Sequence, residues 1–95
     1  MSAYLIVDTV LSDPDRYEAY KDKVPGLVKK HGGEYLVRDG EFEVIEGNWQ
    51  PNRLVLFRFP DRQAIHNLFN DPDYQPLKEL RQQIATSNIV AVDGL

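Results

Sequence analysis

The sequence contains no cysteine, which excludes disulfide bonds, thiolate metal ligands and a cysteine nucleophile. It also has no excess of basic residues, because 11 lysines and arginines stand against 15 aspartates and glutamates, a formal net charge of −4. Nucleic-acid-binding domains usually carry a basic face, so we expect no nucleic-acid partner. The sequence also contains no run of lysine and arginine of the kind that binds anionic lipid.

Long apolar runs are missing as well. Leu5-Ile6-Val7 is far too short to cross a membrane or to form the core of a signal peptide, so we expect no membrane association and a cytoplasmic location. A glycine-rich phosphate loop is also absent, since Gly32-Gly33 closes a predicted helix instead of opening one. Ser2, Ser12 and Ser87 occur in no nucleophile-elbow context.

The sequence has only two histidines. His31 falls at the end of a predicted helix, where a positive imidazole is favourable, and His66 falls near the start of another. Neither is paired along a helix with a carboxylate aimed at the same point, so we expect no metal site and no cofactor.

What is present predicts a single domain over residues 1–95. The order of the predicted elements is βαββαβ, with main strands at Ala3 to Val10, Glu34 to Arg38, Arg53 to Phe59 and Asn88 to Asp93. This is the ferredoxin-like motif, an α+β fold with an antiparallel sheet of order 4-1-3-2. Phe42 to Glu46 is predicted as a short additional strand of a hairpin.

Helix signals fill the segments between the strands. Asp13 is predicted to cap a helix that has Pro14 at its first position, and Gly32 to end it. Pro25 is predicted to interrupt this helix with a kink near Val24, because its ring removes a hydrogen bond. A second helix is predicted after Pro60-Asp61, and Asp71-Pro72-Asp73 is predicted to break it and start another.

The strands are apolar on both faces. In the first strand, Tyr4, Ile6 and Val10 point one way and Ala3, Leu5 and Val7 the other, with Asp8 as the exception. The helices of this fold cover only one face of the sheet, so the other face needs a cover of its own. The pattern therefore predicts a homodimer that packs sheet against sheet, with a monomer whose sheet is partly wet as the alternative.

The residue pattern also resembles a known family. It is similar to domain-of-unknown-function family 1330, within the dimeric α/β-barrel superfamily, over nearly the whole chain. The resemblance rests on Asp13-Pro14 with Tyr17 and Tyr20, Gly32-Gly33, Tyr35-Leu36-Val37-Arg38, Glu46-Gly47, Arg53, Tyr74-Gln75 with Leu77, Arg81 and Val92-Asp93-Gly94. One departure is Asp39, where a glycine often follows the arginine. The resemblance implies a ferredoxin-like dimer, and it brings no assigned reaction, cofactor or catalytic residue. Related superfamily members include monooxygenases that work without a metal, and a shared fold is weak evidence for any one chemistry.

The predicted topology gathers arginine and aromatic residues at one end of the sheet. The candidates for ligand binding there are Tyr17, Tyr20, Arg38, Trp49, Arg53 and Arg81. Guanidinium groups grip carboxylate or phosphate, and the rings supply apolar area, so we expect a cleft for a small anion with an aromatic or apolar body. Asp8 and Tyr20 are the candidates for proton transfer.

Each of these residues also has a structural explanation. Tyr17 and Tyr20 fit the apolar stripe of a helix, and Trp49 could cover its loop or lie against a second subunit. Arg38 and Arg53 could pair with Glu46, Asp8 or Asp39, and Arg81 could pair with Asp8 instead of a ligand. Three functions therefore stay open: a cofactor-independent enzyme, a binder of small acids, and a structural dimer whose cleft is filled by its own side chains.

Overall fold

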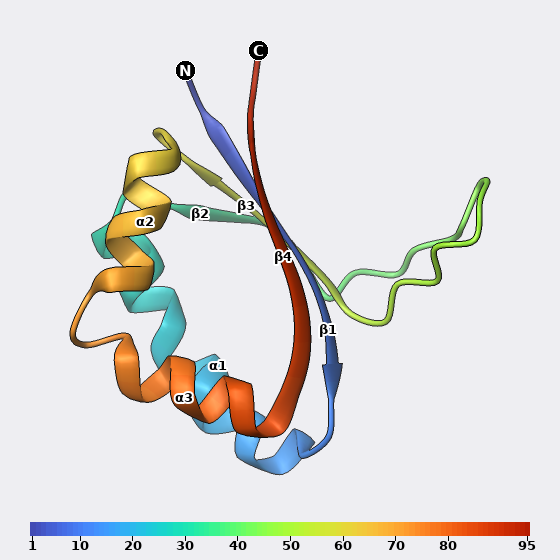
Figure 1. The fold of residues 1–95 in the computed structure, drawn as a ribbon, viewed down its shortest axis with the longest axis horizontal. Helices are drawn as coiled ribbons and strands as arrows, with labels where there is room; N and C mark the ends of the chain where they lie inside the picture. The colour runs from blue at the N-terminus through green and yellow to red at the C-terminus, as the bar shows by residue number, and fades with distance from the viewer.

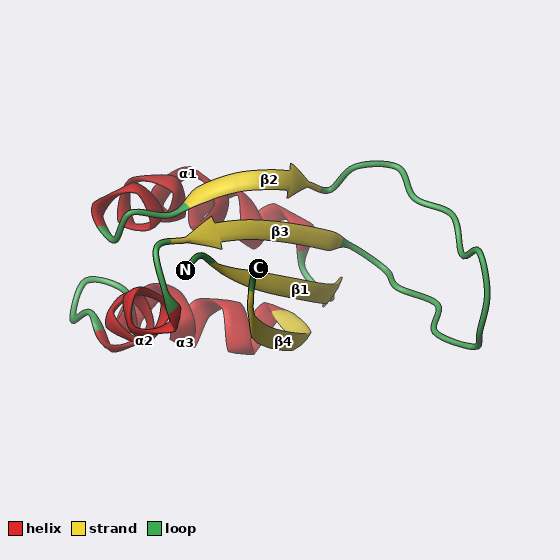
Figure 2. Ribbon diagram, turned by 90° about the horizontal axis from the view of Figure 1, so that it is seen from above, coloured by secondary structure: helices red, strands yellow, loops and turns green.

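The computed structural model describes residues 1–95. Its elements are β1 (Ala3–Leu11), α1 (Pro14–Lys30), β2 (Glu34–Arg38), β3 (Leu54–Phe59), α2 (Arg62–Asn70), α3 (Gln75–Ile84) and β4 (Ala85–Asp93). The sheet has the order β2-β3-β1-β4, and every neighbouring pair is antiparallel. All three helices lie on one side of it (Figure 1), and Figure 2 shows the same layers from above. The predicted ferredoxin-like α+β fold is confirmed.

The alternation along β1 separates its two faces as predicted. Ala3 and Leu5 are buried beneath the helices, whereas Tyr4 and Ile6 are only partly covered on the other face and Val10 is exposed there. Side chains from β3 and all three helices complete the core on the helix side. Burial of this apolar area is the main force that holds the helices on the sheet.

The face of the sheet without helices (Figure 1), which we call the open face, exposes several apolar side chains. Val90 is 57% exposed and Val92 is 47% exposed, and their antiparallel partners on β1 are Ile6 and Tyr4. None of the helices combines the length and the apolar character that spanning a membrane requires.

Helix α1 begins as predicted, with the Asp13 carboxylate accepting a hydrogen bond from the Arg16 amide at 3.2 Å and Pro14 in the first turn. It ends before Gly32, whose φ of +78° a glycine adopts without strain. Pro25 does not end the helix, because α1 continues through it to Lys30, and the kink near Val24 stays a prediction. The carbonyl four residues before Pro25, that of Lys21, finds another donor, described below.

Residues 39–53, which we call the arm, join β2 to β3 and project away from the fold (Figure 1). The predicted strand from Phe42 to Glu46 is wrong, since the arm contains no strand. Pairing between β2 and β3 ends at Arg38 and Val55. Beyond it, the Asp39 amide donates to the Leu54 carbonyl at 2.9 Å and the Arg53 carbonyl accepts from the Thr9 amide at 3.0 Å. The arm thus exposes Ile45, at 83%, and Trp49, at 60%.

The break between α2 and α3 is confirmed, although α3 begins only at Gln75. Asp71 ends α2, and its carboxylate accepts hydrogen bonds from Lys30 at 2.8 Å and His31 at 2.7 Å. The Asp71 side chain is only 4% exposed. These bonds, the one from Lys30 first, hold the pKa of Asp71 well below its usual range and fasten the end of α1 to the α2–α3 connection.

Candidate functional site

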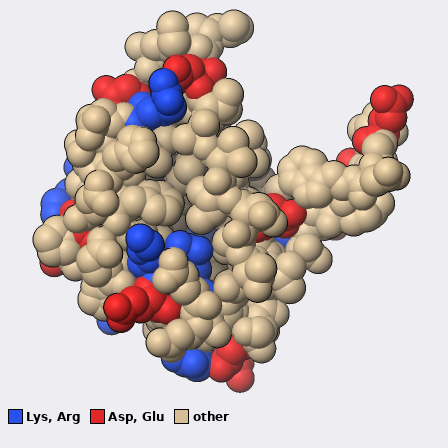
Figure 3. All heavy atoms as spheres, in the orientation of Figure 1, with Lys and Arg blue, Asp and Glu red and all other residues tan.

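A pocket opens between α1, α3 and the helix-covered face of the sheet. Its cavity volume is about 50 Å³, and the space reaches about 580 Å³ when the open mouth and the solvent in it are included. Sixteen residues line it: Leu5, Val7, Thr9, Tyr17, Tyr20, Lys21, Val24, Tyr35, Arg38, Arg53, Val55, Phe57, Phe69, Tyr74, Arg81 and Ile89. Four of them are cations and none is acidic, although the whole chain is negative. Figure 3 shows basic atoms gathered in a hollow of the surface.

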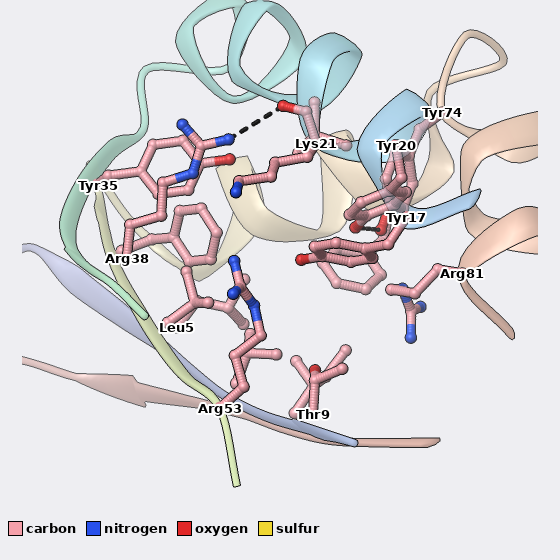
Figure 4. A pocket seen from close by; sticks show the side chains of 16 residues that line it. Leu5, Thr9, Tyr17, Tyr20, Lys21, Tyr35, Arg38, Arg53, Tyr74 and Arg81 are labelled. Atoms are coloured by element: carbon pink, nitrogen blue, oxygen red, sulfur yellow. Dashed lines mark hydrogen bonds between the residues drawn. The ribbon is translucent and has the colours of Figure 1, made fainter. Parts of the chain in front are cut away.

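Arg81 comes from α3 and is only 8% exposed. No carboxylate forms an ion pair with it, and its Nε atom is buried without a hydrogen-bond partner. Figure 4 shows its guanidinium at one side of the pocket, beneath Tyr17, Tyr20 and Tyr74. An unpaired buried charge is strongly unfavourable. The fold therefore holds at this point a cation that an anion would stabilise.

Arg53 precedes β3 and reaches into the middle of the pocket (Figure 4). Its guanidinium lies 5.1 Å from the centre of the Tyr17 ring, a cation–π distance, and pairs with the Asp39 carboxylate. Its Nε atom is also buried and unbonded. Of the three carboxylates predicted as partners of Arg53, Asp39 is the one that forms an ion pair with it. Arg53 thus has one counterion and a free donor that remains.

Arg38 reaches the pocket because β2 contains a bulge. Tyr35 pairs with Phe57 and Val37 with Leu56, so the register shifts by one residue between them. Plain alternation would put Arg38 on the open face, whereas the bulge returns it to the same face of the sheet as Tyr35. The Arg38 guanidinium lies 4.9 Å from the centre of the Tyr35 ring.

Pro25 supplies the second part of this geometry. Without an N–H group it leaves the Lys21 carbonyl of α1 without its helical donor, and Arg38 donates a hydrogen bond to that oxygen at 3.0 Å. This bond is drawn in Figure 4. A proline inside a helix and a bulge inside a strand therefore act on the same guanidinium and hold it at the mouth of the pocket.

The tyrosines form the wall beside Arg81. The rings of Tyr17 and Tyr20 are stacked with centres 5.4 Å apart, and the Tyr20 and Tyr74 hydroxyls share a hydrogen bond of 2.9 Å. Burial, followed by the proximity of Tyr74, raises the pKa of Tyr20 far above its ordinary value. The Tyr20 hydroxyl therefore stays protonated at neutral pH and can donate a hydrogen bond, but it is a poor proton acceptor.

Two of the predicted site residues lie elsewhere. Trp49 belongs to the arm and does not line the pocket. Asp8 is buried at 8% exposure, where it accepts hydrogen bonds from Trp49 Nε1 at 3.0 Å and from the Asn52 amide at 2.9 Å. It fixes the base of the arm and pairs with no arginine. The structure brings together the other five candidates: Tyr17, Tyr20, Arg38, Arg53 and Arg81.

The pocket is also lined by residues that the sequence pattern did not predict there: Lys21, Thr9, Tyr35 and Tyr74. Lys21 follows Tyr17 by four positions in α1, a spacing that could have placed it on the same helix face. Tyr74 carries no such signal, because its position depends on how the α2–α3 connection folds. No group of three or more histidine, aspartate and glutamate side chains is close enough to hold a metal ion.

A comparison with protein-family models finds a match over nearly the whole chain. A family model described as "Domain of unknown function (DUF1330)" matches residues 2–95. No curated protein gives a significant match.

Solved structures show the same fold at low sequence identity. RPA0582, a protein of unknown function from Rhodopseudomonas palustris, is 20% identical with a TM-score of 0.78, over 99% of this chain and 82% of that one. A dimeric ferredoxin-like protein of unknown function from Jannaschia is 13% identical with a TM-score of 0.73, over 99% and 100%. SnoaB from Streptomyces nogalater, a cofactor-independent oxygenase, is 10% identical with a TM-score of 0.68, over 99% and 93%. At these identities the likeness concerns the fold.

Proposed function

Starting from the DUF1330 family, to which this chain belongs, we propose that the protein binds a small organic anion in the pocket between α1, α3 and the sheet. The anionic group pairs with Arg81, and an aromatic or apolar body lies against the tyrosines and the sheet. The proposal assigns a ligand class to a pocket that the family description leaves without one.

Arg81 is the observation that carries the proposal. The residue is 8% exposed and lines the pocket, it has no carboxylate partner, and its Nε is buried without a hydrogen-bond partner. Removing a charged group from water without a partner costs several kcal/mol in real proteins. A carboxylate accepts two parallel hydrogen bonds from a guanidinium, so it offsets that cost more completely than a neutral ligand does.

The remainder of the lining favours an organic anion over a bare inorganic one. Eleven of the sixteen lining residues are hydrophobic, and they include Tyr35 and Phe57, whose ring centres are 4.5 Å apart. Such a wall contacts an aromatic or aliphatic body. Arg53 lies beside the anionic group and Tyr20 can donate a hydrogen bond to it.

The test is a thermal-shift screen of aromatic and aliphatic carboxylates and organic phosphates. A ligand at a hundredfold its dissociation constant adds about 2.7 kcal/mol to the free energy of unfolding. Arg81→Met should lose the shift, whereas the matched control Arg62→Met, on α2 and paired with Asp93 outside the pocket, should keep it. If no compound stabilises the wild type, or if Arg81→Met responds like the wild type, the proposal is wrong.

Catalysis is a second candidate function at the same site. Arg81, Arg53 and the Tyr20–Tyr74 hydroxyls surround an apolar space, an arrangement that stabilises negative charge on a substrate oxygen. The shared fold with the oxygenase SnoaB is consistent with it but assigns no reaction. Incubation of each compound that binds, with and without air, followed by mass spectrometry, separates an enzyme from a binder.

We further propose that the protein forms a homodimer through the open face, with the arm adding to the interface. The chain exposes 6268 Å², whereas a compact monomer of 10.9 kDa exposes about 5,600 Å². The excess of about 700 Å² is close to the ~800 Å² that each partner buries in a standard interface. Exposed apolar side chains lie on the open face, at Val90 and Val92, and on the arm, at Ile45 and Trp49.

A further inference from the structure

We infer that the ligand of this pocket carries two anionic groups, one that pairs with Arg81 and one that pairs with Arg38, with an apolar body between them. The inference rests on the proposed function and narrows it from small organic anions to dianions of the dicarboxylate class. It follows from the positions of the cations, from the way in which Arg38 is held and from the ion pairs that the fold already contains.

The cations lie at two separate places along the pocket. In Figure 4, Arg38 and Lys21 lie together on one side, Arg81 lies on the opposite side and Arg53 lies between them. Leu5 and Val7 from β1, Tyr35 from β2, and Val55 and Phe57 from β3 also line the pocket and supply aromatic and aliphatic surface. A monoanion that pairs with Arg81 would leave its far end beside Arg38 and Lys21. A second carboxylate at that end would meet both cations.

Three features of the fold restrain the side chain of Arg38. The bulge in β2 turns its side chain to the pocket face, and the Lys21 carbonyl released by Pro25 accepts one of its hydrogen bonds. Contact with the Tyr35 ring restrains the guanidinium further. A cation that is already restrained loses little side-chain entropy when it binds an anion. The geometry therefore provides a preorganised second anchor.

The existing ion pairs leave two guanidiniums of the pocket free. Arg53 is paired with Asp39, whereas neither Arg81 nor Arg38 forms an ion pair with any carboxylate. Two unpaired arginines match two anionic groups. Because Arg38 is exposed to solvent and Arg81 is buried, we expect Arg81 to determine whether an anion binds and Arg38 to determine the preference for a dianion.

The test uses pairs of acids that differ only in the second carboxylate: benzoate with terephthalate, and hexanoate with adipate. Isothermal titration calorimetry should find one of the dianions to be about tenfold or more tighter than its monoanion, well beyond the factor of two that a symmetric ligand gains from having two equivalent ends. Raising the salt concentration should reduce this preference, because the second contact is exposed to solvent.

Two variants assign the ends of the ligand. Arg38→Gln should weaken the dianion and reduce its preference over the monoanion to about twofold, whereas Arg81→Gln should weaken both acids of a pair. If monoanion and dianion bind equally in the wild type, or if Arg38→Gln weakens both to the same extent, the inference fails while the proposed function stands. If neither acid of either pair binds and the wider screen is also negative, the proposed function fails as well.

Discussion

Arg81 gives the most distinctive prediction, because its replacement by an apolar residue should stabilise the free protein. Arg81 is 8% exposed, and neither a carboxylate nor a hydrogen bond offsets the burial of its Nε. Methionine is long and unbranched, so Arg81→Met keeps most of the contacts of the aliphatic stem with the core while it removes the charge. Although substitutions at buried sites usually destabilise a protein, we expect Arg81→Met to stabilise this one.

The magnitude follows from the cost of the unsatisfied group. A buried donor without a partner costs about 1–3 kcal/mol, and replacing buried ionic groups by apolar residues stabilises proteins by up to about 4 kcal/mol. We expect Arg81→Met to add about 2 kcal/mol to the free energy of unfolding. For a chain of 95 residues, each kcal/mol raises Tm by about 4–8 °C, so Tm should rise by about 8–16 °C.

The assay is urea and thermal unfolding of the wild type and Arg81→Met, without ligand and with a saturating carboxylate from the screen. Gln82→Met is the control, since Gln82 is exposed on the same helix and its replacement should change stability by less than about 0.5 kcal/mol. Saturating carboxylate should stabilise the wild type but not Arg81→Met, and so cancel or reverse the difference in unfolding free energy between the two proteins. A loss of more than 1 kcal/mol in ligand-free Arg81→Met would show that Arg81 is already satisfied within the fold, and would refute the reasoning.

Three further predictions concern other parts of the molecule. Pro25→Ala returns an amide donor to the Lys21 carbonyl, so it should raise Tm and reduce the preference for dianions in calorimetry; an unchanged preference would separate Pro25 from the site. The lowered pKa of Asp71 contributes stability above its unfolded value of about 3.9, and that contribution is lost as the pH falls. The Tm difference between wild type and Asp71→Asn should therefore shrink from pH 7 to pH 2, and a constant difference would contradict it. Val90→Asp places a charge on the open face and should yield monomers in light scattering at concentrations where the wild type is a dimer; a dimeric variant would exclude this face.

The regular parts of this fold could be predicted from the sequence because local chemistry determines them. Asp13 and Pro14 define the start of α1, and Gly32 supplies the positive φ that ends it. Alternation in β1 separated the buried Leu5 from the partly covered Ile6. Each of these features depends on a few neighbouring residues, whose preferences agree with the final structure.

The irregular parts could not be predicted, because they depend on partners that are distant in the sequence. Alternation alone would put Tyr35 and Arg38 on opposite faces, and the bulge that unites them is visible only in the pairing with β3. Pro25 was interpreted as an interruption that kinks α1, and the sequence did not show that the Lys21 carbonyl it leaves free accepts a hydrogen bond from Arg38. The strand predicted from Phe42 to Glu46 is absent, since this part of the arm pairs with no other strand.

The candidate site was predicted more completely in its residue types than in its geometry. Topology placed the three arginines of the pocket at one end of the sheet, and the structure brings them into one lining. The sequence did not distinguish Arg53, which has Asp39 as its counterion, from Arg81, which has none. That distinction requires every acidic side chain to be placed, and the proposed function depends on it.

The most direct test of the anion pocket is an NMR measurement of the arginine Nε–H signals in ¹⁵N-labelled protein, with the Arg81 signal assigned by comparison with Arg81→Lys. We predict that the Arg81 signal shifts progressively as a small carboxylate, benzoate or terephthalate, is added, and that the neutral amide benzamide leaves it unchanged. An Arg81 signal that stays in place for every carboxylate at saturating concentration would contradict the account.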